Sequence, residues 1–260
     1  MLSITDYQET IKLLLSEGGK YLLLLIFVVL SIRLWKRFPR ASGVNRQQTL
    51  LLSVVASIAA CAIGLLSMRH SLGRLYAAYG LRAFDQGNIL AAAGLFHQSQ
   101  GYWQDADTIG KEGVCRLLLE LPNGPALLDE AKARRKGASS GFESHYTGLY
   151  YLFHEQPEKA FPFLRASAAE LHFRWVDLKL LALILLEKNQ PADAAQLMAP
   201  FAQVQITDFD HAYVMASLKV VENKPLEARA LLERFQPETL PEFWKARFER
   251  LMSKTRQLTS

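Results

Sequence analysis

The six histidines are the side chains of this chain best suited to act as general bases or metal ligands near neutral pH. No two of them stand four residues apart, and no His-Glu-x-x-His string occurs. That spacing is what brings two imidazoles to one helix face around a zinc ion. Without it, surface or groove positions are the favoured interpretation for His70, His97, His145, His154, His172 and His211.

Asp208 and Asp210 are two neighbouring carboxylates that could share acid-base work. The favoured alternative is that Thr207 or Asp208 caps the following helix, with both acids near its positive end. The basic string KARRKG, Lys132–Gly137, could bind phosphate or an acidic partner, but it also fits cations at a helix C-terminus before a glycine stop. The sequence therefore predicts no catalytic residue, no metal and no cofactor, and hence no enzyme.

Two cysteines, Cys61 and Cys115, lie in an apolar run and in an amphipathic segment far downstream, so no disulfide is expected. The net charge of +5 is concentrated near the N-terminus, where residues 1–68 hold seven basic and three acidic groups. The remaining 192 residues hold 23 basic and 22 acidic groups. A nucleic-acid binder needs a basic face on its folded part, so no nucleic-acid partner is expected.

Apolar stretches near the N-terminus predict two membrane-spanning helices. Residues 49–68 are twenty residues without a charge, which matches a hydrocarbon core about 30 Å thick. Small residues that suit close approach of another membrane helix are Ser57, Ala59, Ala60 and Gly64. Residues 18–35 form the other predicted span, with Tyr21 and Trp35 as interfacial aromatics. A cleaved signal peptide is the alternative, disfavoured by the long, mildly acidic segment before the apolar run.

Positive residues mark the predicted cytoplasmic side of this transmembrane helical hairpin. The basic loop 36–48 carries Lys36, Arg37, Arg40 and Arg46 and no acid. Short basic loops stay cytoplasmic, so the chain is predicted as a multi-pass protein of a bacterial inner membrane, with its C-terminal part more readily periplasmic than cytoplasmic. The basic residues Arg69, Arg74 and Arg82 argue against this orientation, although Asp85 dilutes them. Residues 1–17 are predicted as an amphipathic segment.

A Pro-x-x-Ala pattern recurs every 34 residues in the C-terminal part. Its three copies begin at Pro157, Pro191 and Pro225, and proline suits the first turn of a helix. Two residues earlier stand Glu155, Asn189 and Asn223, with Gly87 at the same place in an earlier copy; asparagine and glycine suit the left-handed backbone of a tight turn. Counting back from Ala228 in steps of 34 reaches Ala194, Ala160, Ala126 and Ala92.

These positions resemble the tetratricopeptide repeat: a small residue, an aromatic residue three later, a turn, then alanine and a large apolar residue four later. Gly80, Ala92 and Phe96 follow the pattern in the first copy, while the second copy follows it least. The resemblance implies an all-α fold in which a solenoid of about five helix pairs spans residues 73–240. Residues 241–260 are then an amphipathic capping helix.

The resemblance also implies that the first helix of each pair lines a concave groove for a partner helix or peptide. The implied groove residues are Phe142, His145, Leu149, Leu152, Phe153, Val176, Lys179, Leu183, Leu186, Asp210, Tyr213 and Ser217. The alternative is a tightly wound solenoid, or a groove filled by the C-terminal helix. Proteins similar in layout serve envelope assemblies, including exopolysaccharide synthesis and secretion complexes. We therefore expect an inner-membrane scaffold for membrane or envelope proteins; the alternative is a membrane-bound chaperone or maturation factor for an exported enzyme.

Overall fold

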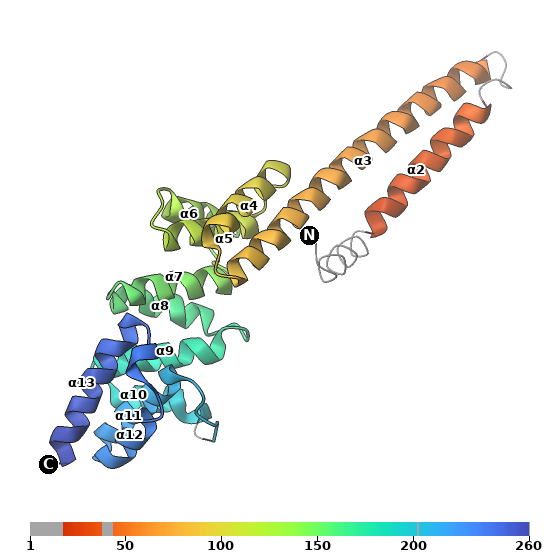
Figure 1. Ribbon diagram of the computed structural model, residues 1–260. Coiled ribbons are helices and arrows are strands. Elements are labelled where there is room, and N and C mark those ends of the chain that lie inside the picture. Colours follow the sequence, from red (N-terminus) through yellow and green to blue (C-terminus); the bar gives the residue numbers. More distant parts are fainter. Residues whose placement is uncertain (1–17, 38–43, 202, 260) are drawn as a thin grey trace. The chain divides into compact units, whose positions relative to one another are not determined.

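The structure is a computed structural model that describes residues 18–37, 44–201 and 203–259. The predicted segment 1–17 and residues 38–43 of the predicted basic loop lie outside these described residues. Within the described ranges the chain forms twelve α-helices and no strand, which confirms the all-α prediction (Figure 1).

Two compact units divide the chain at residue 137. The helices of the first unit are α2 (Gly18–Arg37), α3 (Val44–Asp85), α4 (Ile89–Tyr102), α5 (Ala106–Leu118) and α6 (Gly124–Arg134). Those of the second unit are α7 (Gly141–Phe153), α8 (Pro157–Ser167), α9 (Arg174–Glu187), α10 (Pro191–Met198), α11 (Phe209–Val221), α12 (Pro225–Leu232) and α13 (Glu242–Thr259), with short 3-10 helices η2 (Ala199–Phe201) and η3 (Pro237–Thr239).

The helix α3 is the one described helix that is long and apolar enough to cross a membrane. Its apolar side chains are largely exposed, with exposed fractions of 65% at Leu51, 63% at Ile58 and 65% at Leu65. The helix continues without a break to Asp85 and there packs against α4 (Figure 1). The predicted boundaries at residues 68 and 73 therefore fall inside a single helix.

The helix α2 lies beside α3 (Figure 1), and polar side chains join the two helices. The hydroxyl oxygens of Ser31 and Ser57 are 2.6 Å apart, and Trp35 Nε1 donates to Ser57 Oγ at 3.1 Å. A Cβ atom on Gly64 would lie 3.5 Å from Leu24 Cδ1, which is an ordinary van der Waals contact, so Gly64 faces α2. Of the four small residues predicted to allow helix approach, Ser57 and Gly64 therefore face α2.

Four of the five helix pairs share one turn, in which the middle of three linking residues is left-handed. These residues have φ values of 77° at Gly87, 56° at Glu155, 59° at Asn189 and 60° at Asn223. In each turn the next residue donates its backbone N–H to a carbonyl five residues earlier, as Gln190 does to Leu185 at 2.8 Å. The prolines predicted to begin second helices do begin α8, α10 and α12. The local turn chemistry read from the sequence is confirmed.

The pair of α5 and α6 departs from the strict period. Its left-handed turn residue is Glu120, and Pro122 and Asn123 lengthen the connection before α6 begins at Gly124. Ala126 is consequently exposed, whereas Ala131 is fully buried. The prediction that Ala126 is the packing residue of this pair is wrong, because two additional turn residues shift the register.

Close contact between the paired helices depends on small residues. The alanines Ala92, Ala160, Ala194 and Ala228 are fully buried. On the first helices, a Cβ on Gly80 would approach Phe96 Cε1 to 2.7 Å, and one on Gly148 would approach Leu164 to the same distance. Real Cβ atoms do not come this close, so the two glycines hold their helix pairs at a separation that alanine would widen.

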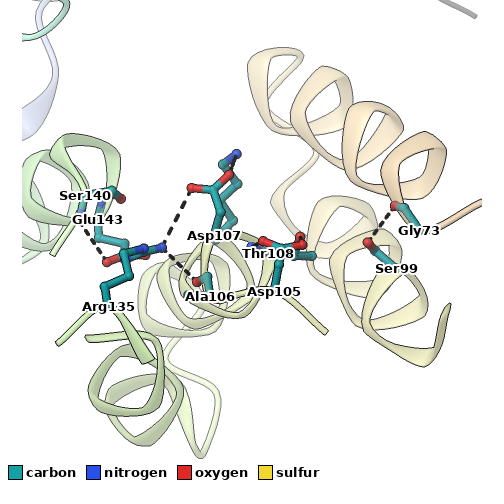
Figure 2. A network of polar contacts seen from close by, with 10 residues as sticks. Gly73, Ser99, Asp105, Ala106, Asp107, Thr108, Arg135, Ser140 and Glu143 are labelled. Atoms are coloured by element: carbon teal, nitrogen blue, oxygen red, sulfur yellow. Dashed lines mark hydrogen bonds and ion pairs between the residues drawn. The ribbon is translucent and has the colours of Figure 1, made fainter. Parts of the chain in front are cut away.

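Polar contacts fasten the ends of the helices in the first unit (Figure 2). The Ser99 hydroxyl donates to the Gly73 carbonyl at 2.6 Å, joining α4 to α3. Asp105 caps α5 by accepting from the Thr108 backbone at 2.9 Å. Arg135 donates to the Ala106 carbonyl at 2.8 Å and thereby ties the end of α6 to the start of α5. The basic string at residues 132–137 thus ends a helix, and Gly137 N–H donates to Lys132 O at 2.9 Å.

Glu155→Gly is expected to stabilise the second unit by about 1 kcal/mol, because glycine adopts the left-handed backbone without the steric cost that a side chain brings. The matched control Ala195→Gly, at an exposed position in the middle of α10, is expected to cost about 1 kcal/mol through helix propensity. Urea unfolding followed by tryptophan fluorescence measures both changes. Equal destabilisation by the two glycines would contradict the assigned turn geometry.

Candidate functional site

The twelve residues predicted to line the groove all fall in the second unit, but they differ in accessibility. The fully packed ones are His145, Leu152, Lys179, Leu183 and Tyr213. Half-buried positions are Phe142, Leu149, Leu186, Asp210 and Ser217. Only Phe153 and Val176 are exposed, at 50% and 42%. Much of the predicted groove wall is therefore part of the hydrophobic core and unavailable to a partner.

The helix α13 covers one end of this wall. The Phe243 ring meets Phe153 edge-on with centroids 4.9 Å apart, and the Trp244 ring lies 5.6 Å from Tyr213. Further along, the side chains of α13 that are buried in the core are Phe248, Leu251 and Met252. The C-terminal helix thus occupies space that the resemblance would leave for a partner, as the alternative interpretation anticipated.

A buried polar triplet joins three elements of the second unit. His145 Nδ1 of α7 lies 2.7 Å from Asp177 Oδ1 of α9, and the Ser167 hydroxyl at the end of α8 donates to the other oxygen of Asp177. The residue types are those of a hydrolase triad, but both Ser167 and His145 bind the carboxylate. The serine hydroxyl has no link to the imidazole that would deprotonate it. His145 is 6% exposed, and Asp177 and Ser167 are not exposed at all. A substrate therefore has no access to these side chains, and their role is structural.

Residues 137–141 read GASSG, which is the spacing of a hydrolase nucleophile elbow around Ser139. Sequence reasoning passed over this string. That motif requires a strand that turns sharply into a helix. Here the string follows the helix α6, and Ser140 caps α7 in a reciprocal capping box with Glu143. The string therefore explains a helix start and does not present an activated serine.

Lys179 lies between the two carboxylates that the sequence analysis singled out. Its Nζ is 2.9 Å from Asp208 Oδ2 and 2.8 Å from Asp210 Oδ2. Burial raises the pKa of Asp210, and the hydrogen bond to Asp208 adds to that rise. Burial also acts to raise the pKa of Asp208, but hydrogen bonds from Asp210 and Lys179 outweigh it and lower this pKa to about 2. Asp208 also accepts from the His211 backbone at 3.1 Å, so its predicted capping role is confirmed.

His211 is buried directly after these charges, and its surroundings oppose protonation of the imidazole. Burial lowers the pKa of this imidazole from 6.5, and the nearby Asp208 only partly opposes the shift. Its Nε2 is the one buried side-chain nitrogen or oxygen without a hydrogen-bond partner in the part of the chain described here. The Phe201 ring packs against it, with ring centroids 5.3 Å apart.

Acidification is expected to destabilise the second unit through His211. Because the folded state has the lower pKa, the unfolded chain binds the proton first, and the free energy of unfolding falls as the pH drops below 6.5. Urea midpoints measured at about pH 7 and about pH 5 test this. The variant His211→Gln should lose less stability between the two pH values than the parent chain. An undiminished loss would assign the pH dependence to other groups.

The first unit holds a second buried acid, Glu112. Its carboxylate accepts from Gln100 Nε2 at 2.6 Å and from Arg116 Nε at 2.7 Å. Beside it, burial raises the pKa of Cys115 to about 12, with the charge of Glu112 adding to the rise. A thiol with this pKa stays protonated and is a poor nucleophile. Among the described residues no group of three His, Cys, Asp or Glu side chains is placed to hold a metal ion.

Half-buried aromatic rings gather near the N-terminal ends of α7 and α9, and Val176 of α9 is exposed. We define the aromatic patch as Phe142, Tyr146, Phe173 and Val176. The rings of Phe142 and Tyr146 lie 4.7 Å apart, and Tyr146 meets Phe173 at 6.2 Å. Phe173 stacks on the buried His145 at 4.4 Å, which fixes its ring. The resemblance did not indicate Phe173, because this residue precedes α9 in a connection of irregular length.

Comparisons of the chain with protein-family models, with curated proteins and with solved structures give no match.

Proposed function

We propose that this chain is a non-catalytic membrane-anchored adaptor whose helix pairs hold a partner protein at a bacterial inner membrane. The observation that carries the proposal is the continuity of α3, in which an exposed apolar stretch runs directly into the first helix of a pair. A chain built this way holds its first helix pair at a fixed distance from the proposed membrane span. The tetratricopeptide resemblance supports the same function from the repeat pattern.

The buried polar groups favour a binding role over a catalytic one. The carboxylate of Asp177 is hydrogen-bonded to His145 and Ser167. The carboxylate of Glu112 is hydrogen-bonded in the same way to Gln100 and Arg116. Groups arranged like this specify how helices pack. An active site instead needs a nucleophile or base that can reach a substrate.

We assign the partner to the aromatic patch, which contains the predicted groove residues Phe142 and Val176. Phe142 and Val176 lie on the first helices of two successive pairs, and Val176 is 42% exposed. Aromatic side chains on a rigid helical surface bury a large apolar area with little loss of conformational entropy. A partner helix or extended peptide with apolar side chains suits such a surface. The residues covered by α13 are left out of this assignment.

Partner capture tests the assignment. The chain is purified from its native membrane in mild detergent, and the stoichiometry of the co-purifying protein is measured. The double variant Phe142→Ala with Val176→Ala is expected to retain about one tenth of the partner, because two anchor side chains are lost. Leu226→Ala is the matched control, since Leu226 is 70% exposed on a second helix. Unchanged capture by the double variant overturns the patch, and sub-stoichiometric capture of unfolded clients identifies a chaperone instead.

Topology is tested separately with C-terminal fusions. The proposed two-span arrangement keeps the basic residues Lys36, Arg37, Arg40 and Arg46 in the cytoplasm and therefore places the helix pairs that follow α3 in the periplasm. A fused alkaline phosphatase should be active, and a fused cytoplasmic-type fluorescent protein should stay dark. The opposite pair of results places the units in the cytoplasm and restricts the partner to proteins of that compartment.

A further inference from the structure

The position of Arg69 on α3 marks the end of the apolar stretch. Between Arg46 and Arg69 the sequence contains no charged residue, a helical length of roughly 35 Å. The last apolar side chains before Arg69 are strongly exposed, with 63% at Leu66 and 60% at Met68. A span embedded in lipid therefore brings the Arg69 guanidinium to the level of the headgroups.

The C-terminal end of α4 is fixed onto α3 at this same level. A Cβ on Gly73 would lie 2.7 Å from Trp103 Cβ, so the glycine allows the tryptophan to sit directly against the helix. The Tyr102 ring stacks on Tyr76 with centroids 5.4 Å apart, and Arg69 donates to the Gly101 carbonyl at 3.3 Å. Trp103 and Tyr102 are thus held beside the end of the apolar stretch, where interfacial aromatic residues gather.

A recess of about 390 Å³ opens between these elements. Its lining includes Leu66, Arg69, Gln100, Tyr102, Trp103 and Gln104. Arg69 is the single charged side chain of this lining. The neighbouring acid Glu112 does not offset it, because Gln100 and Arg116 bind both carboxylate oxygens of Glu112. The recess therefore combines one cation with aromatic and amide side chains.

We propose that this recess binds the headgroup phosphate of an anionic phospholipid, with the acyl chains lying along the exposed apolar face of α3. The guanidinium of Arg69 recognises phosphate oxygens through paired N–H donors. Leu66 lines the recess and also belongs to the lipid-facing surface, which joins the phosphate position to the acyl-chain position. The inference rests on the membrane anchoring of the proposed function and adds a ligand to it.

A second recess, of about 430 Å³, shows why the first one suits an anion. It also borders Trp103, but there the cations Arg74 and Lys111 share the lining with Asp105 and Asp107. Lys111 and Asp107 form an ion pair. In the second recess two cations are balanced by two carboxylates, whereas in the first recess the other lining residues beside Arg69 are neutral.

Lipid quenching of Trp103 fluorescence tests the proposal. The full chain is reconstituted in nanodiscs of phosphatidylcholine that contain increasing fractions of brominated phosphatidylglycerol or brominated phosphatidylcholine. The signal of Trp103 is obtained as the difference from the variant Trp103→Phe. Brominated phosphatidylglycerol should quench at about one tenth of the mole fraction that phosphatidylcholine needs, and Arg69→Gln should abolish the preference. Arg82→Gln, which removes an equal charge further along α3, should keep it.

Three results would overturn the lipid site. They are equal quenching by the two lipids, a preference that survives in Arg69→Gln, and release of brominated phosphatidylglycerol by inorganic phosphate, which would reassign the recess to a free anion. Extraction of native membranes with alkaline carbonate is measured first. If carbonate releases the chain, membrane anchoring fails together with the lipid site. If the chain stays in the membrane and shows no lipid preference, the lipid site fails alone.

Discussion

Asp177→Ala is expected to lower the free energy of unfolding of the second unit by about 3–5 kcal/mol, the cost of breaking a buried charged network by removing one member. The substitution leaves the His145 ring nitrogen and the Ser167 hydroxyl without their shared acceptor, and it opens a cavity where no side-chain surface is exposed. Three elements lose their common contact, so the change should be visible as a lower urea midpoint.

The matched control for Asp177 is Asp193, which stands in the first turn of α10 as Asp177 stands in the first turn of α9. Asp193 is exposed, and Asp193→Ala should cost no more than about 0.5 kcal/mol. Asp177→Asn keeps one oxygen acceptor and should fall between the two. A loss below about 1 kcal/mol in Asp177→Ala would show that the triplet is not a packing determinant.

Ending the chain after Pro241 is expected to abolish cooperative unfolding of the second unit. The helix α13 buries Phe248, Leu251 and Met252, and each such side chain contributes about 1.5–3 kcal/mol. Their combined loss is comparable with the 5–15 kcal/mol, roughly, that stabilises an ordinary domain. Thermal unfolding and binding of a hydrophobic dye report the result, since removal of α13 exposes Tyr213 and its neighbours.

A chain that ends after Arg256 is the control, because it removes only the exposed last residues of α13 and should keep the parent melting temperature. An unchanged melting temperature in the longer deletion would mean that α13 is a dispensable cover. In that case the whole predicted groove, including Phe153 and Tyr213, returns as a partner surface. The deletion therefore distinguishes a structural cap from a removable occupant.

The turns and helix starts could be predicted from sequence because their causes are local. A left-handed position favours glycine or asparagine, and a first helical turn accepts proline, wherever the helix later packs. Asn189 before Pro191 and Asn223 before Pro225 satisfy both requirements. Glu155 is neither glycine nor asparagine, yet its alignment with Asn189 and Asn223 in the repeat predicted its left-handed backbone.

The register of the second pair could not be found by counting. Counting in steps of 34 residues takes no account of insertions. The additional residues Pro122 and Asn123 displace the packing position from Ala126. The glycine that begins α6 was the available signal. A Cβ on Gly124 would lie 2.8 Å from the Leu117 backbone nitrogen, so a glycine there indicates close helix contact.

The buried triplet was missed because residue 145 was assigned by its distance from the repeat alanine. That count placed His145 on a groove wall, whereas its ring reaches Asp177 in the next pair. The acid itself was the signal. Asp177 is the one acid in the first turn of the largely apolar helix α9, and a buried carboxylate requires donors nearby. Which donors it finds depends on how neighbouring pairs stack, which no single pair determines.

The unbroken course of α3 has a mechanical consequence. Its 42 residues contain no proline and extend about 63 Å, so one continuous helix forms both the proposed span and the first helix of the first pair. Each residue added to α3 or removed from it near Arg69 would rotate α4 by about 100° around the axis of α3. The number of residues in α3 thus sets the direction in which α4 faces relative to the proposed membrane span.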